Sequence, residues 1–162
     1  MKKITLIITV FLLTSLLSVV SQGTEPRYKI YQNNNAPTVE DNLTGLMWQQ
    51  NSTASAPLSW VDALKYCEEL KYAGYTDWRL PQIAELLSIV DEKKKTEPAI
   101  NTVYFSDFIA GSGFWTSTTS RSITTSAYAV YFNEQNSTVG RGGVSSLSKT
   151  GKAQTLCVRT SH

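Results

Sequence analysis

Histidine is almost absent from this chain of 162 residues, because the single one is His162 at the very end. Imidazole is the commonest general base and a frequent zinc ligand, so this scarcity argues against most histidine-dependent catalysis and most zinc sites. The sequence also lacks a phosphate-binding loop, a nucleophile elbow and any cluster with metal-ligand spacing. We therefore expect a protein that is not an enzyme, uses no cofactor and holds no metal ion.

A large excess of either charge is missing too. The 15 Lys and Arg residues against 13 Asp and Glu residues give a formal net charge of +2. Lys2 and Lys3 account for that excess, so the part of the chain after residue 23 is neutral overall. Without a general positive field we expect no binding to nucleic acid or to an anionic membrane. A local basic patch is still compatible with this balance.

Only one long apolar run is present, from Ile4 to Val20, and it follows the two lysines at the start. A short basic region, an apolar stretch and small residues behind it are typical of a secretory signal peptide. We predict a signal peptide over residues 1–23, cleaved after Ser21 or Gly23. The alternative is a retained membrane anchor, since this run reaches the lower length limit for crossing a bilayer. With the signal removed, we expect no membrane span and export to the periplasm, the cell surface or the medium.

Cysteine is scarce, and Cys67 and Cys157 are the only two. In an oxidising compartment an isolated pair usually forms a disulfide. Closing so long a loop stabilises a protein by about 4–5 kcal/mol on the chain-entropy model. The alternative is a redox-active or nucleophilic thiol, but the pair lacks CxxC spacing and a nearby histidine. We predict a structural disulfide.

The order of the expected elements gives the fold class. Residues 24–40 form a leader with one short strand at 28–31, and a glycine turn precedes an apolar strand that ends at Gln49. Helical spacing predicts two helices in residues 59–90. Beyond residue 97, aromatic and β-branched segments at 114–116, 128–132, 144 and 155–158 predict antiparallel strands. Helices early and strands late indicate an α+β domain over residues 41–160.

Both expected helices have recognisable starts. Ser59 and Asp62 have the spacing of a capping box, and the helix that they begin is expected to run on until Gly74. Its buried stripe includes Cys67. Pro81 suits the first position of the second helix. The expected stripe of that helix consists of Ile83, Leu86, Leu87 and Val90.

Several short sequence motifs occur along the chain in a characteristic order. They are TGLMWQ at 44–49, YC at 66–67, GYTDWRLP at 74–81, PAIN at 98–101, FWTST at 114–118 and CVR at 157–159. Together they resemble the Lcl C-terminal domain family, named after the C-terminal region of the Legionella collagen-like protein. The resemblance implies a C-type lectin-like fold, in which two helices pack on a twisted antiparallel sheet with long loops. It also implies that the disulfide joins the first helix to the last strand.

The best-known member of this family is an adhesin that binds glycosaminoglycans and host proteins. The resemblance implies an exported binding domain, adhesin-like, that recognises a glycan, a glycosaminoglycan or a surface protein, and we expect a monomer. The alternative is a structural or assembly module that binds a protein partner in the cell envelope. Calcium-dependent sugar binding is not expected, because Glu97-Pro98 is followed by Ala99 and a Trp-Asn-Asp motif is missing.

We expect the ligand surface on the loops between Phe105 and Gly143, where Ser, Thr, Gly and Tyr are frequent and periodicity is weakest. The candidate ligand contacts are Arg121, Tyr128, Tyr131 and Arg141, with Tyr104 and Lys152 as further candidates. A second group is expected to be structural, and it consists of Trp48, Asp77, Trp78, Arg79, Pro81 and Trp115. In this group Asp77 and Arg79 should fix the connection between the helices. The alternative is that they form a ligand site beside Trp78.

Overall fold

The structure, a computed structural model, describes residues 25–33, 35–52, 56–107, 111–133 and 142–161, so the predicted signal peptide lies outside it. Its elements are β1 (Tyr28–Tyr31), β2 (Thr38–Asp41), β3 (Leu46–Gln49), α1 (Trp60–Glu68), α2 (Ile83–Ser88), β4 (Phe114–Thr119), β5 (Ser126–Tyr131), β6 (Gly143–Ser148) and β7 (Val158–Thr160). The α+β class is confirmed, but the strands form two antiparallel sheets where one was expected. No helix in the described part has the length and apolar character needed to cross a membrane.

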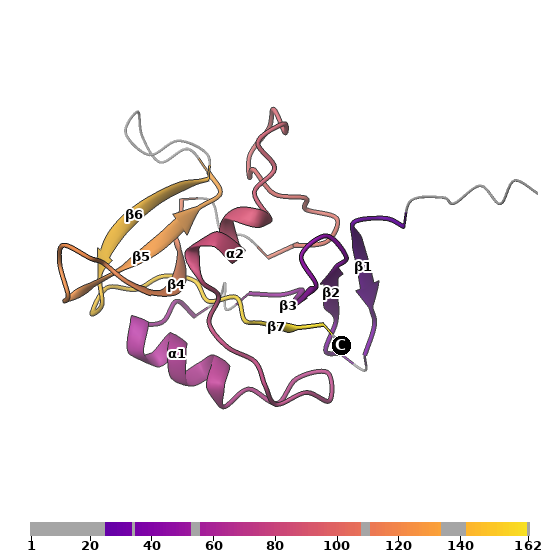
Figure 1. Cartoon of the computed structure of the whole chain (residues 1–162), viewed down its shortest axis with the longest axis horizontal. Helices are drawn as coiled ribbons and strands as arrows, with labels where there is room; N and C mark the ends of the chain where they lie inside the picture. Colours follow the sequence, from indigo (N-terminus) through magenta and orange to yellow (C-terminus); the bar gives the residue numbers. More distant parts are fainter. Residues whose placement is uncertain (1–24, 34, 53–55, 108–110, 134–141, 162) are drawn as a thin grey trace, which may run out of the picture.

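The first sheet has the strand order β1-β2-β3-β7 and brings the two ends of the described chain together (Figure 1). Its turn between β2 and β3 closes at Gly45, whose φ of 66° suits glycine and whose N–H donates to the Asp41 carbonyl at 2.9 Å. The last strand pairs with β3, with Val158 opposite Trp48. The strand expected at 28–31 is confirmed as β1, and both β1 and β2, from the expected leader, belong to this sheet.

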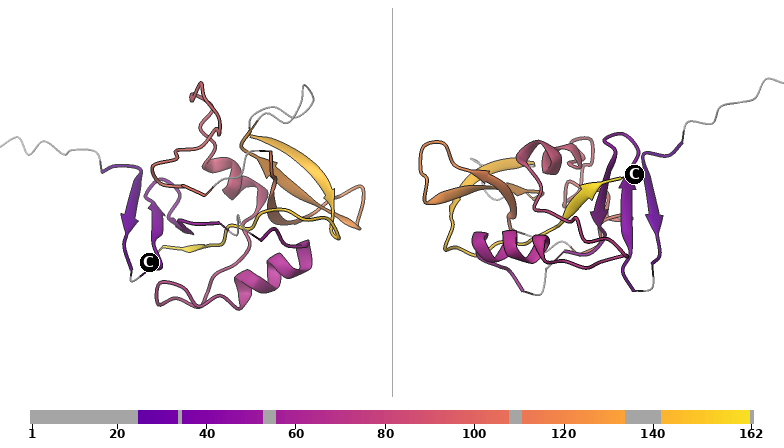
Figure 2. Two further views of the ribbon diagram at one scale, coloured as in Figure 1. Left: turned by 180° about the vertical axis from the view of Figure 1, so that it is seen from behind. Right: turned by 60° about the horizontal axis from the view of Figure 1, so that its bottom comes forward.

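The second sheet has the order β4-β5-β6 and lies at the opposite end of the molecule from β1 and β2 (Figures 1 and 2). Its central strand β5 pairs with β6 in a regular register from Ser126–Ser148 to Tyr131–Gly143. The ladder between β4 and β5 is irregular, because its register shifts between Trp115 and Thr119. This sheet carries Tyr128 and Tyr131, two of the three tyrosines that the sequence suggested for ligand contact.

The first helix begins as predicted and ends earlier. Ser59 is its N-cap, and the Ser59 hydroxyl accepts a hydrogen bond from the Asp62 N–H. The expected end at Gly74 is wrong, since α1 stops at Glu68. Tyr72 and Tyr75 instead exchange backbone hydrogen bonds across a tight turn, in which Ala73 has a φ of 54° and Gly74 a φ of 84°. A right-handed helix cannot continue through two such residues.

The second helix is shorter than its apolar pattern suggested. Its N-cap is Gln82, whose N–H donates to the Glu85 carboxylate, so Pro81 precedes the helix and the expectation of a first helical position is wrong. Leu86 is fully buried, whereas Leu87 is 37% exposed and does not belong to the stripe. Because α2 ends at Ser88, the next buried residue is Ile89, just behind the helix.

The core consists of two hydrophobic clusters. The first, here called the aliphatic cluster, joins the first sheet, α2 and the second sheet, and it includes Val39, Leu46, Trp48, Leu86, Ile89, Ile100, Phe105, Phe114, Val130, Phe132, Leu156 and Val158. The second, here called the disulfide cluster, lies beside α1 and includes Met47, Ala63, Cys67, Trp78, Leu80, Trp115, Ala127, Ala129, Ala153 and Cys157. The predicted disulfide is confirmed: Cys67 in α1 and Cys157, directly before β7, are bonded with a Cα–Cα distance of 5.6 Å.

Candidate functional site

The Asp77-Trp78-Arg79 segment makes contacts inside the fold. Trp78 is buried and its indole N–H donates to the Tyr72 carbonyl at 3.1 Å. Arg79 donates to both carboxylate oxygens of Glu85, at 2.7 and 2.6 Å. These bonds fix the connection to α2 from one side, which supports the structural interpretation of the segment over a ligand site.

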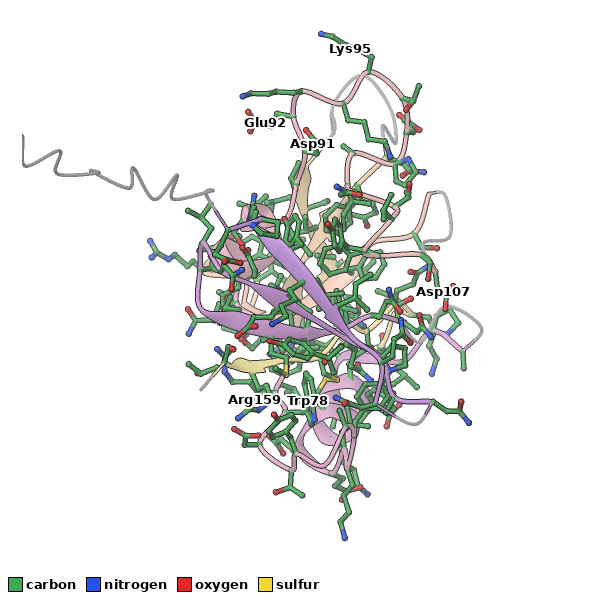
Figure 3. All side chains as sticks on the ribbon, turned by 90° about the vertical axis from the view of Figure 1, so that its right-hand side faces the viewer. Trp78, Asp91, Glu92, Lys95, Asp107 and Arg159 are labelled. Carbon is green, nitrogen blue, oxygen red and sulfur yellow. A yellow bond between two sulfur atoms is a disulfide. The ribbon has the colours of Figure 1, made fainter. Side chains whose placement is uncertain are left out.

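Asp77 is held by the last strand. Arg159 in β7 donates to the Asp77 carboxylate through Nε at 2.7 Å and through Nη2 at 3.1 Å. The Arg159 guanidinium also lies 3.9 Å from the centre of the Tyr75 ring, which covers one face of that ring. Trp78 packs against the same Tyr75 ring, with the ring centres 6.5 Å apart, and Trp78 and Arg159 are labelled in Figure 3. Arg159 therefore contacts both the Asp77 carboxylate and the Tyr75 ring, so these groups serve contacts inside the protein.

The other structural candidates are buried as well. Trp48 and Trp115 have no exposed surface, so neither can form a stacking platform for a sugar. Trp115 donates its indole N–H to the Leu58 carbonyl at 2.9 Å. Pro81 is buried, and its carbonyl accepts the Ser117 N–H of β4 at 2.8 Å. These contacts connect α1, α2 and the second sheet.

The two candidate tyrosines of the second sheet lie on opposite faces. Tyr128 is opposite Ser146 and Tyr131 is opposite Gly143 in the regular β5–β6 ladder. Residues three apart on a strand point to opposite sides, so one ligand cannot contact both rings on one face. Tyr131 packs against the disulfide cluster, and burial raises the pKa of its hydroxyl. Tyr104 is half-buried against Tyr28, with the ring centres 5.1 Å apart.

Arg121 lies at the far end of β5 from Tyr131. It is exposed in the turn between β4 and β5, where the Ser120 N–H bonds to the Ser126 carbonyl at 2.9 Å. Ser126 and Tyr131 are five strand residues apart, which corresponds to about 17 Å. Arg141 lies outside the described residues. The described candidate contacts are therefore not brought into one site.

Arg121 is instead accompanied by two lysines, and these three residues are here called the basic end. The Lys149 N–H donates to the Thr125 carbonyl at 2.9 Å, which places the end of β6 beside the Arg121 turn. The Lys149 ammonium lies 4.2 Å from the centre of the half-buried Trp60 ring. Lys152 follows a tight turn closed by the Gly151 N–H and the Ser148 carbonyl, and it is exposed. The sequence did not point to Lys149, because its position depends on how two turns pair.

One acidic residue stands at the start of the neighbouring helix. Asp62 is exposed in the first turn of α1, and its carboxylate accepts a hydrogen bond from the Ser59 hydroxyl. It offsets part of the positive charge of the basic end, but the three cations outnumber it. The basic end can therefore attract an anionic polymer, with Trp60 as a rigid support for the Lys149 ammonium.

A cavity of about 430 Å³ lies between the start of β1 and the segment behind α2. Its polar lining residues are Arg27, Tyr28, Asp91, Glu92, Lys93 and Asn101, and its apolar floor is Ile89 and Val90. Arg27 donates to both oxygens of the buried Asp41 carboxylate, at 3.0 and 2.8 Å. The hydrogen bond to Asp41 raises the pKa of Arg27, and burial raises the pKa of Tyr28 to about 12. Both groups therefore stay protonated at neutral pH.

The cavity was missed by sequence reasoning because its residues come from three separate segments. Arg27 and Tyr28 belong to the expected leader, Asp91 follows the second expected helix, and Asn101 lies ten positions further on. A metal-binding cluster of three or more His, Cys, Asp or Glu side chains is not found in the part of the chain that the structure describes. The polar side chains that line the cavity are hydrogen-bond donors and acceptors.

Comparison with known protein families places this geometry in context. The sequence model of the Lcl C-terminal domain family matches residues 37–159, which is most of the chain. No curated protein sequence matches the chain. The matched range contains both helices, the basic end and the disulfide, whereas Arg27 and Tyr28 lie before it.

Proposed function

The chain belongs to the Lcl C-terminal domain family, and on that premise we propose that it is an exported, non-enzymatic binding domain whose basic end attaches to a sulfated or carboxylated glycan of the glycosaminoglycan class. This is an adhesin-like role, in which the domain binds a polymer and catalyses no reaction. A family of surface-associated domains with no established enzymatic activity supports the non-enzymatic part of the proposal.

The basic end is the observation that carries the ligand class. The Lys149 N–H bonds to the Thr125 carbonyl of the turn that carries Arg121, and Lys152 follows Lys149 by three positions, so the three cations come from neighbouring turns at one edge of the second sheet. Linear polyanions bind to such groups of cations largely by electrostatic attraction, so a domain with no net charge needs a local excess of this kind. The tyrosines of β5 are not required for this mode of binding.

Export and a lectin-like fold are part of the same proposal. The disulfide between Cys67 and Cys157 supports an oxidising compartment, since such bonds are rare in the cytosol. Two helices packed against antiparallel sheets, with the first and last described strands in one sheet, support a C-type lectin-like architecture. The glycan-binding surface would then be carried by the turns of the second sheet.

The test is binding of the oxidised mature protein to immobilised heparin, with and without EDTA. We compare R121Q/K152Q with K65Q/K71Q, because each removes two exposed cations and the second pair lies on and just behind the outer face of α1. R121Q/K152Q should weaken binding about tenfold, or about 1.4 kcal/mol, and the control pair should change it little. EDTA should have no effect.

Equal weakening by both variants would contradict a localised site. Loss of binding in EDTA would contradict the calcium-independent mode. Absence of binding to heparin and to a wider glycan panel would reject the glycan class and favour a protein partner in the cell envelope.

A further inference from the structure

We propose that the cavity between β1 and the segment behind α2 is a second binding site, and that it takes an uncharged saccharide unit. This site is separate from the basic end, since its residues lie on the first sheet and on residues 89–101. Two of its polar residues, Arg27 and Tyr28, precede the range that matches the family. The proposal therefore stands on the geometry of this chain.

The Arg27 guanidinium is held in a fixed orientation. Its Nε and Nη2 atoms bond to the Asp41 carboxylate, and Nη2 also donates to the Ser88 carbonyl at the end of α2, at 2.6 Å. Within the described residues, no hydrogen bond uses Nη1. Because Arg27 lines the cavity and is partly exposed, this remaining nitrogen is a preorganised donor.

Asp91 supplies an acceptor on the opposite segment. One carboxylate oxygen, Oδ1, accepts the backbone N–H groups of Lys93 and Lys94, at 3.1 and 3.2 Å. The Asp91 N–H is itself bonded to the Ala99 carbonyl at 2.8 Å, which fixes the start of the loop. No described hydrogen bond uses Oδ2, so this atom can accept from a ligand.

Asn101 and Tyr28 add two further donors. The Asn101 side-chain oxygen accepts the Val103 N–H at 3.1 Å, which leaves the amide nitrogen without a partner among the described residues. No described hydrogen bond uses the Tyr28 hydroxyl. A tyrosine hydroxyl is protonated at neutral pH, and burial raises the pKa of Tyr28 further, to about 12. The cavity thus presents donors on two sides and a carboxylate acceptor on a third.

The charges of the cavity favour a neutral ligand. The Arg27 charge is neutralised by Asp41, and the other charged residues that line the cavity are Lys93 and the two acids Asp91 and Glu92. A polyanion would meet these carboxylates, whereas a vicinal diol can donate to a carboxylate and accept from a guanidinium or an amide. The floor of Ile89 and Val90 suits the C–H groups of a sugar ring, and 430 Å³ lies within the usual range for a small-molecule pocket.

The Tyr28 ring is not a stacking platform in this site. The Arg27 guanidinium lies 4.6 Å from its centre, and the rings of Tyr104 and Phe105 pack against it. Recognition therefore rests on hydrogen bonds in an open cavity. For this reason we expect binding in the millimolar range for a single sugar unit, a binding free energy of about −4 kcal/mol.

The test is titration of the isotope-labelled mature protein by two-dimensional NMR with D-galactose, D-mannose and N-acetyl-D-glucosamine, and with D-glucuronate as the charged counterpart. At least one neutral sugar should shift the backbone amides of Tyr28, Glu92 and Asn101, and the amides around Arg121 should not move. R121Q/K152Q should keep these shifts, so the test is independent of the glycosaminoglycan proposal.

The decisive variant is Asp91→Asn. It keeps the oxygen that accepts the Lys93 and Lys94 N–H groups, so the loop is preserved, while the charge and the free carboxylate oxygen are lost. Its matched control is Asp107→Asn, which removes the same charge from an exposed carboxyl that lies away from Asp91 and Glu92 (Figure 3). Asp91→Asn should weaken sugar binding at least tenfold, and the control should leave it unchanged.

Absence of shifts with all three neutral sugars would overturn the proposal. So would shifts caused by D-glucuronate alone, which would assign the cavity to anions, and so would equal weakening by the two Asp→Asn variants.

Discussion

The two clusters of the core hold their surroundings together in different ways. The aliphatic cluster is filled by large side chains, with leucine, isoleucine, valine and phenylalanine around Trp48. The disulfide cluster contains four alanines, Ala63, Ala127, Ala129 and Ala153, around the Cys67–Cys157 bond. The alanines contribute little apolar area, so the large apolar side chains of this cluster are chiefly Trp78, Trp115 and Leu80, and the covalent link and the indole hydrogen bonds add to their burial.

The tryptophans show the same difference. On the disulfide side, the indole N–H groups of Trp60, Trp78 and Trp115 donate to backbone carbonyls at 2.8, 3.1 and 2.9 Å. On the aliphatic side, the buried indole nitrogen of Trp48 has no hydrogen-bond partner among the described residues. The disulfide side is therefore fixed by specific bonds and carries the basic end, while the aliphatic side is fixed by burial and carries the cavity.

Removal of the disulfide should have the largest effect. C67A/C157A should lose about 4 kcal/mol of the free energy of unfolding, because a loop of 90 residues is no longer closed in the unfolded chain. Chemical denaturation with and without the bond measures this loss, and wild-type protein treated with reductant is the control. After this substitution, amide hydrogen exchange should accelerate more in α1 than in β2 and β3.

Uniform acceleration throughout the chain would contradict this comparison. It would mean that the two clusters unfold as one cooperative unit, so that the disulfide stabilises both sides equally.

The tryptophan comparison can be tested with one substitution at two sites. Trp115→Phe and Trp48→Phe remove a similar volume from fully buried positions, but only the first breaks an indole hydrogen bond, the one to the Leu58 carbonyl, which also accepts the Ala153 N–H. We expect Trp115→Phe to be more destabilising by about 1–2 kcal/mol. Urea unfolding of both variants measures the difference, and equal losses would show that the indole hydrogen bond contributes nothing net.

Local signals in the sequence were sufficient for part of this architecture. The start of α1 at Ser59 follows from a side-chain cap, and the disulfide follows from the fact that only two cysteines are present. A helix that runs on to Gly74 is excluded by the positive φ of Ala73, and no residue type other than glycine announces that conformation reliably. The division of the strands into two sheets depends on contacts between distant segments, which local pattern does not encode.

For the candidate sites, some of the missing information was in the sequence. The spacing of three between Tyr128 and Tyr131 already places their side chains on opposite faces of one strand. The sequence alone therefore argued against both tyrosines as contacts of one ligand. The position of Lys149 beside Arg121 depends on the pairing of two turns. Arg27, directly before β1, bonds to Asp41, which lies 14 positions later in the sequence. Neither contact has a local signature. The sequence supported the class of protein better than the position of its sites.

The smallest expected effect concerns the ion pair that links the two halves. Arg79 bonds through its backbone to Val158, next to the disulfide, while its side chain holds Glu85 at the start of α2. Burial alone would raise the pKa of Glu85, but the hydrogen bonds from Arg79 and from the Gln82 N–H lower it overall. A folded-state pKa below the unfolded value of about 4.3 means that the pair stabilises the protein above that pH. Its contribution is lost as the pH falls through the folded-state pKa.

Glu85→Gln should therefore lower the free energy of unfolding by about 1 kcal/mol at pH 7, and by less as the pH falls through the folded-state pKa of Glu85, where the wild-type carboxyl becomes protonated too. Urea unfolding at a series of pH values gives the free energy of unfolding of the wild type and of Glu85→Gln, and the two values should converge as the pH falls. Glu68→Gln is the control, because Glu68 is exposed at the end of α1, where the structure shows no ion pair for it among the described residues. Parallel curves for Glu85→Gln and wild type would show that Glu85 acts through the Gln82 cap alone, since a glutamine retains that hydrogen bond, and that its charge does not couple the two clusters.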